Sequence, residues 1–174
     1  MFNRFIFIII LALFSGCSTM SIPSVIGGDP SSVESKISSS IDKENEVYGI
    51  GSAKIESSGT LIAMGKAKKE ARDELKDKIL SEEKIIFNSF LINADPYTKG
   101  ILEPALSDLK DYTATELVQK SIEKDSWVEK NEAYTIISIS KGEILSESQN
   151  IFIQYLDDIT NKFQTIKEGV SQPQ

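Results

Sequence analysis

The stretch VYGIGSAKI, residues 47–55, carries the pattern from which the fold class follows. Tyr48 and Ile50 fall on one face of an extended chain, because side chains alternate between the two faces of a strand. Gly49 and Gly51 have no side chain, and glycine inside a strand commonly marks a close approach by a neighbouring helix or strand. We therefore predict a strand here, packed closely against another element.

After this strand, residues 57–91 predict one long helix or two consecutive helices. The two alanines of its apolar stripe would let this helix lie close to the sheet, and we expect Ser57, Ser58 or Thr60 to cap its first turn. The stripe recurs every three or four residues, as in a half-buried helix, and comprises Met64, Ala67, Ala71, Leu75 and Ile79.

The next segment predicts a short helix and a hairpin. Residues 93–100 interrupt the helical pattern, and residues 103–113 predict a short helix with Pro104 in its first turn. Residues 117–140 then predict a β-hairpin that turns at residues 129–132. Its first arm carries Val118, Ile122 and Val128, with Trp127 on the opposite face, and its second arm reads AYTIISIS.

A final amphipathic helix is predicted over residues 143–167, with Phe152, Tyr155, Ile159, Phe163 and Ile166 on one stripe. The order strand, helices, hairpin, helix implies an α+β fold, in which helices pack on one face of a small antiparallel sheet. We expect a single domain over residues 46–168 and a loose tail at residues 169–174.

The N-terminus carries a different signal. Residues 5–14 form an unbroken apolar run, which is too short to cross a bilayer as a helix and is typical of a signal peptide. Two small residues and then Cys17 follow. The segment resembles a bacterial lipoprotein signal over residues 1–16. That resemblance implies cleavage between Gly16 and Cys17 and attachment of lipid to the Cys17 thiol.

Other interpretations of Cys17, the only cysteine, are an incidental thiol in a secreted protein, a retained membrane anchor and a catalytic thiol. Residues 17–45, which begin with the lipidated Cys17, are rich in serine and predict a flexible tether. Val33, Ile37 and Ile41 stand at helical spacing, so a short helix is the alternative there.

Composition restricts the chemistry open to the chain. Its 174 residues include 26 acidic and 19 basic ones, for a formal net charge of −7, which argues against a nucleic-acid partner. With no histidine and one cysteine, the chain has no Ser-His-Asp or Cys-His arrangement and no four-ligand zinc site. We therefore expect no catalytic residues, no metal and no cofactor.

Several short motifs resemble functional sites, but we expect structural or solvent-facing roles for all of them. They are Gly49-Ile50-Gly51, with Lys54 where a nucleotide loop needs a third glycine; the basic cluster Lys66, Lys68, Lys69 and Arg72; the acidic groups Asp42, Glu44 and Glu46, Asp108 and Asp111, and Asp157-Asp158; the pair Ser140-Lys141; and Trp127.

A strand with GIGSA, a helix with AKKEARDEL and a hairpin with the arm AYTIISIS together resemble the Lpp-twenty family of small bacterial envelope lipoproteins. A related pattern occurs in the N-terminal domain of the flagellar assembly protein FlgT. The match covers residues 47–141 and the lipoprotein signal. Its closest positions are Gly49, Gly51, Ala53, Ala67, Ala71, Arg72 and Leu75. The resemblance implies an envelope lipoprotein without known enzymatic activity.

The sequence therefore predicts a lipid-anchored, non-catalytic protein of the bacterial cell envelope, held at the outer membrane. We expect a role as an interaction or assembly module, with a protein partner or self-association in the envelope. The alternative is a surface-exposed lipoprotein that binds a host or environmental ligand.

Overall fold

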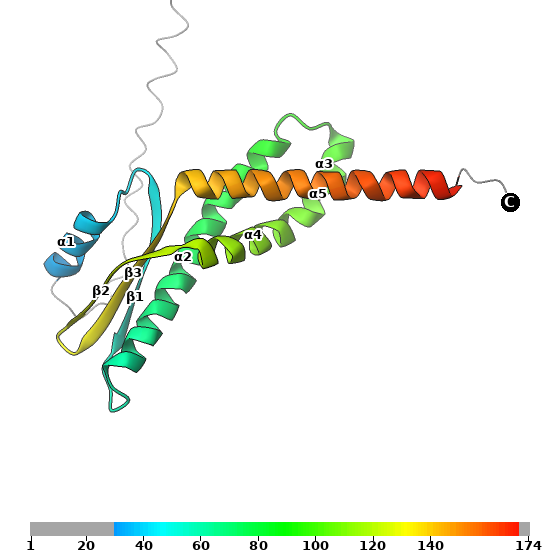
Figure 1. Ribbon diagram of the computed structural model, residues 1–174. Coiled ribbons are helices and arrows are strands. Elements are labelled where there is room, and N and C mark those ends of the chain that lie inside the picture. The colour runs from blue at the N-terminus through cyan, green and yellow to red at the C-terminus, as the bar shows by residue number, and fades with distance from the viewer. Residues whose placement is uncertain (1–29, 171–174) are drawn as a thin grey trace, which may run out of the picture.

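A three-stranded antiparallel sheet organises the domain. The computed structural model describes residues 30–170. The strands are β1 (Glu46–Lys54), β2 (Ile122–Glu129) and β3 (Glu132–Ser140), in the order β1-β3-β2. Helices surround this sheet and continue beyond one end of it (Figure 1). The predicted α+β fold is confirmed.

The central strand, β3, is buried along almost its whole length and joins β2 through a tight turn. Lys130 and Asn131 form the turn with φ angles of 47° and 66°. Two consecutive residues of positive φ are the signature of the type I′ turn, whose twist matches that of a hairpin. A register shift between Glu123 and Asp125 then bends β2.

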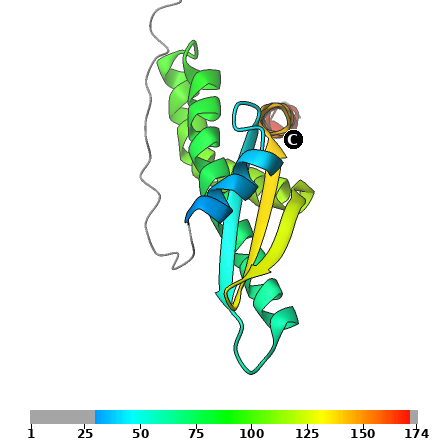
Figure 2. The same ribbon diagram turned by 90° about the vertical axis from the view of Figure 1, so that its left-hand side faces the viewer.

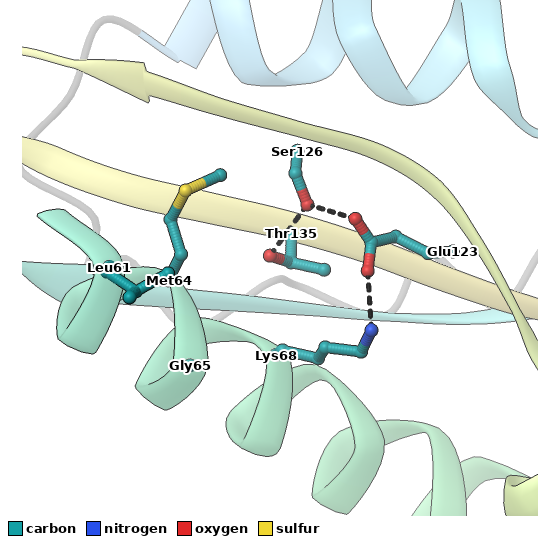
Figure 3. A pocket seen from close by; sticks show the side chains of 7 residues that line it. All are labelled: Leu61, Met64, Gly65, Lys68, Glu123, Ser126 and Thr135. Carbon is teal, nitrogen blue, oxygen red and sulfur yellow. Dashed lines mark hydrogen bonds and ion pairs between the residues drawn. The ribbon is translucent and has the colours of Figure 1, made fainter.

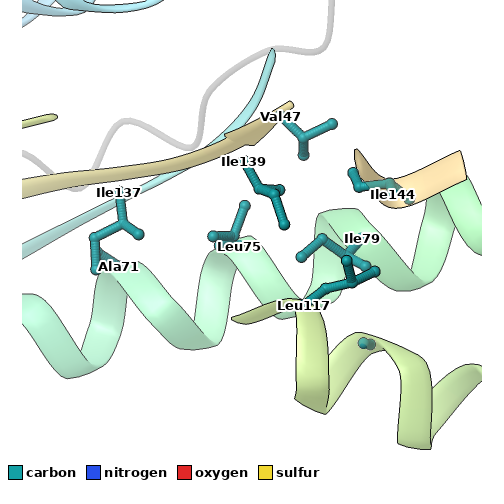
Figure 4. Packing of buried hydrophobic residues seen from close by; sticks show 9 residues of the cluster. Val47, Ala71, Leu75, Ile79, Leu117, Ile137, Ile139 and Ile144 are labelled. Atoms are coloured by element: carbon teal, nitrogen blue, oxygen red, sulfur yellow. The ribbon is translucent and has the colours of Figure 1, made fainter. Parts of the chain in front are cut away.

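One face of the sheet packs against the long helix α2 (Thr60–Leu91). A Cβ atom added to Gly49 would overlap the carbonyl oxygen of Ala71, and one added to Gly51 would overlap that of Ala67. The strand and helix backbones therefore touch because all four residues are small, as the sequence predicted. Further along α2 the contact becomes a core of larger aliphatic side chains (Figure 4).

The free edge of β1 is closed by side chains of α2. Glu74 accepts a hydrogen bond from the amide of Ile50, and Lys78 donates one to the carbonyl of Tyr48. Glu70 accepts a further bond from the amide of Ser52, at 3.0 Å. These side chains occupy backbone groups that would otherwise be open to a further strand.

The other face of the sheet is covered by α1 (Pro30–Ser40), so the prediction that helices pack on one face only is wrong. Figure 2 shows α1 in front of the sheet, with α2 behind it. Val33, Ile37 and Ile41 are buried against Tyr134 and its neighbours. Over these residues the short helix replaces the predicted tether, because its apolar side chains find partners on the sheet.

The segment between α2 and β2 is more helical than predicted. Helix α3 (Pro96–Leu102) begins inside the expected break, because Asp95 caps it by accepting the amides of Tyr97 and Thr98. A 3-10 turn, η2 (Glu103–Ala105), leads into α4 (Leu106–Lys120). Helix α4 takes in Val118, which was expected in the hairpin.

Two smaller predictions also fail or change. The N-terminus of α2 is capped by Gly59, with a φ of 84° and no side-chain hydrogen bond, so neither Ser57, Ser58 nor Thr60 caps it. The last helix, α5 (Lys141–Val170), starts directly at the end of β3 and is longer than predicted. Within residues 30–170, no helix is both long and apolar enough to cross a bilayer.

Candidate functional site

A shallow hollow of about 240 Å³ lies between the first turns of α2 and the strands β2 and β3 (Figure 3). Helix α2 contributes one wall and the strands contribute a polar floor. The residues that line it are Leu61, Met64, Gly65, Lys68, Glu123, Ser126 and Thr135. It combines polar side chains with an exposed apolar rim, which makes it a candidate in the described part of the chain for contact with another molecule.

The polar groups of the hollow are bonded to one another. Lys68 Nζ lies 2.8 Å from Glu123 Oε2, and Ser126 Oγ donates to Glu123 Oε1 at 2.8 Å. Ser126 Oγ is also 3.0 Å from Thr135 Oγ1. The hydrogen bonds from Lys68 and Ser126 hold the pKa of Glu123 below its ordinary value. Glu123 is therefore ionised at neutral pH and already bonded.

This arrangement suits binding better than catalysis. A serine nucleophile needs a base that removes its proton, whereas Ser126 donates to a carboxylate of lowered pKa, which is a weak base. The apolar rim of the hollow is more exposed than its polar groups. Leu61 on this rim is 83% exposed, and Met64 lines the hollow beside it. The hollow can accept an aliphatic group of a partner without breaking any of its own hydrogen bonds.

The predicted cleavage and lipidation site, Gly16 and Cys17, lies outside the described residues. The basic cluster on α2 is present as a charged helix face, in which each of its three lysines meets a carboxylate. Lys66 pairs with Glu56, Lys68 with Glu123 and Lys69 with Asp73, at 3.8, 2.8 and 2.6 Å. The cluster is therefore a solvated helix face, as the sequence predicted, and the structure adds that its lysines are ion-paired.

The acidic motifs also have structural or solvent-facing positions. Asp42 accepts hydrogen bonds from the Asn45 side chain and from the amides of Glu44 and Asn45, which lower its pKa and close the turn before β1. Asp157 and Asp158 are exposed. Among the described residues, no group of three or more acidic, cysteine or histidine side chains is placed to hold a metal ion.

The remaining two motifs are packing and capping elements. Trp127 lies under α1, stacked on Tyr134 with ring centres 5.1 Å apart and with Lys36 Nζ 5.6 Å from its ring centre. Ser140 Oγ accepts the amide of Glu143 and so supports the first turn of α5. Trp127 therefore serves packing, and Ser140, although exposed, serves as a helix-capping residue.

Glu83 is a buried carboxyl that was not predicted from the sequence. Its side chain is fully buried and neither carboxylate oxygen has a hydrogen-bond partner. Burial raises its pKa to about 8, with Lys110 lowering it and Asp111 raising it. A signal was present, because Glu83 continues the buried stripe of α2 four residues after Ile79 and four before Phe87.

The side chains around Glu83 explain why its charged form is disfavoured. Ile79 packs with Ile144 of α5, and Phe87 packs with Phe152 of the same helix, so Glu83 lies between two apolar layers. A carboxylate without partners in such surroundings takes up a proton more readily than it does in water. Glu83 is therefore an acid kept mostly neutral at pH 7, enclosed by the fold and remote from the hollow.

Comparison of the sequence with models of known protein families finds none that matches, and a search among curated proteins finds no matching relative. The resemblance to the Lpp-twenty family therefore stays a prediction from the motifs quoted above.

Proposed function

We propose that the chain is a lipid-anchored, non-catalytic protein of the bacterial envelope, which acts as an interaction or assembly module at a membrane surface. The observation that carries this proposal is the apolar run followed by two small residues and Cys17. Two or more acyl chains hold a protein stably on a bilayer, at about 0.8 kcal/mol for each buried methylene group.

The position of α1 adds a distance limit to this proposal. Only residues 18–29 separate the anchor from Pro30, where α1 begins and packs on the sheet. Thirteen steps from Cys17 to Pro30, at roughly 3.5 Å each, span at most about 45 Å. The domain would therefore stay close to the membrane that holds the lipid.

The hollow beside α2 supports an interaction role. Its charged groups pair with one another, its serine hydroxyl donates to a carboxylate of lowered pKa, and its rim is apolar and exposed. An enzyme needs perturbed groups that converge on a reacting atom. Among residues 30–170, the carboxyl whose pKa is strongly raised, Glu83, is enclosed inside the domain instead.

Lipid labelling in the native host tests the anchor. Cells fed an alkyne fatty acid should label the wild-type chain and leave Cys17→Ala unlabelled and released from the membrane fraction. Ser18→Ala is the matched control and should label like the wild type. An unlabelled, freely soluble wild type would overturn the proposal.

Topology separates the module from the alternative, a receptor for host or environmental ligands. Protease added to intact cells should leave the labelled chain uncut if it faces the periplasm, and cut it if it faces outward. Cleavage on intact cells would favour the alternative over the assembly role.

A further inference from the structure

The apolar stripe of α5 continues past the part of the helix that packs on the domain. Phe152, Leu156, Ile159, Phe163 and Ile166 follow one another at spacings of four, three, four and three residues. The first of them is buried among Phe87 and Phe90. Phe163 and Ile166 are 57% and 61% exposed, and every residue from 161 to 168 is exposed. Figure 1 shows this end of α5 extending beyond α3 and α4.

A groove accompanies the exposed part of the stripe. It has a volume of about 230 Å³ and lies between the end of α3 and α5. Its lining is apolar except for one lysine and comprises Ile101, Ile159, Lys162, Phe163 and Ile166. Large apolar side chains that gather in a groove, without any covering in the described chain, are typical of a protein–protein contact.

The spacing of the stripe points to the kind of partner. Alternating steps of three and four residues form the seam of a left-handed coiled coil, in which each apolar side chain packs into a facing helix. A second α5 would present the same seam, and a twofold contact needs only one surface that is complementary to itself. A membrane surface fits less well, because the acidic Asp157, Asp158 and Glu168 lie on this half of the helix.

The charges flanking the seam determine the direction of pairing. Lys162 directly precedes Phe163, and Lys167 directly follows Ile166, so they occupy the two flanking positions of the seam. In a parallel pair these positions face each other, and Lys162 would meet Lys167 of the second copy. In an antiparallel pair with Phe163 facing Ile166 of the second copy, Lys167 instead lies opposite Thr160.

We propose that the C-terminal half of α5 is a homodimerisation surface, in which Phe163 of each copy packs against Ile166 of the other in an antiparallel pair. The exposed part of the seam, around Phe163 and Ile166, covers about one heptad, fewer than the three or four of an independent coiled coil, so pairing in dilute solution is weak. Lipid anchors would concentrate the copies on one membrane and strengthen the pairing. This last step rests on the proposed anchoring.

Cysteine cross-linking in host membranes tests the arrangement. Two differently tagged chains, Phe163→Cys and Ile166→Cys, would be produced together and also separately, then treated with a mild oxidant. A disulfide needs Cβ atoms about 4 Å apart, so we expect about fivefold more cross-linked dimer from the mixture than from either variant alone. Equal or stronger products from the single variants would indicate a parallel pair, and no product anywhere would exclude the contact; either result overturns the proposal.

The wild-type chain serves as the control that distinguishes failure of the α5 contact from failure of the proposed anchoring. If Cys17 carries lipid, the wild type gives no disulfide dimer and no maleimide labelling after denaturation. If maleimide labels Cys17, the anchor is absent and Cys17 can itself form disulfides. Disulfide products that also appear in the wild type are then assigned to Cys17. The additional dimer that appears only with the 163 and 166 variants still reports on the α5 contact.

A charge variant gives a second test. Ile166→Lys places a positive charge within the apolar seam, between the flanking Lys162 and Lys167, and should abolish the dimer in light scattering of the concentrated, detergent-solubilised chain. Ile153→Lys is the matched control, since Ile153 is also exposed on α5, at 56%, but lies off the stripe. Unchanged circular dichroism would show that both variants fold. Dimerisation of Ile166→Lys at the wild-type concentration would contradict the proposal.

Discussion

The two halves of α2 pack in opposite ways. Its first half touches β1 backbone to backbone, through alanines facing glycines, and its charged side chains also close the β1 edge. Its second half packs side chain to side chain against α4 and α5, and there it encloses the unpartnered Glu83. The backbone contact leaves no room for a larger side chain on β1. The side-chain contact instead encloses a carboxyl group, Glu83, whose charge depends on pH.

The largest effect should come from breaking the backbone contact. We expect Gly51→Ala to destabilise the domain by about 3 kcal/mol or more, because the new Cβ overlaps the Ala67 carbonyl and the helix must move off the sheet. Gly65→Ala is the control: nothing lies within 4 Å of its added Cβ, and alanine inside a helix gains up to about 1 kcal/mol. Urea unfolding measures both, and equal midpoints for the wild type and Gly51→Ala would show that the contact can yield.

Glu83 should give the second half of α2 a pH dependence. Its pKa is about 8 in the folded domain and 4.5 for an ordinary glutamate side chain, so the folded state holds more protons between these pH values. Stability is therefore full below about pH 4.5 and is lost as pH rises towards 8, by about 2–3 kcal/mol between pH 5 and pH 7. Unfolding free energies of the wild type and Glu83→Gln should converge at low pH and diverge above it. Parallel curves would mean that the carboxyl is already solvated.

This contrast also explains what the sequence could predict. The predictions of a strand at residues 47–55 and of a buried stripe through Ala67 and Ala71 were correct. Small residues that recur at a fixed period indicate a close contact between backbones. Val118 was misplaced because its apolar spacing to Ile122 fits a strand as well as a helix, and only the extended backbone of Ser121 separates α4 from β2. The local spacing of apolar residues therefore does not show where α4 ends and β2 begins.

Two features depended on partners that are distant in sequence. The helix α1 is stabilised by burial of Ile37 against the sheet, so its serine-rich sequence alone suggested a tether. The burial of Glu83 requires α5 to lie across α2, which no property of residues 60–91 specifies. The hollow at Lys68 likewise brings together α2 and β2, which are separated by more than one intervening helix in the chain.

Truncating Ile37 tests whether α1 belongs to the sheet end of the domain. Ile37→Ala should cost about 2 kcal/mol, near the lower limit for a buried isoleucine, because α1 is a single short layer. Ser38→Ala, at an exposed position on the same helix, should change little. Trp127 fluorescence during urea unfolding provides the readout, since α1 packs over that ring. An unchanged midpoint for Ile37→Ala would restore the tether interpretation for residues 30–41.

The smallest effect concerns the β1 edge. Glu74→Ala removes the carboxylate that accepts the Ile50 amide, and we expect a loss of about 1 kcal/mol, the usual worth of one hydrogen bond at a partly exposed site. Asp77→Ala, an exposed position one turn away, is the control. The more informative readout is association, because an opened edge strand can pair with another chain. We expect Glu74→Ala to form concentration-dependent oligomers, Asp77→Ala to form none, and the added substitution Ile166→Lys to leave the Glu74→Ala oligomers in place. That result would show that the α2 side chains act chiefly to keep β1 from pairing, separately from the contact proposed for α5.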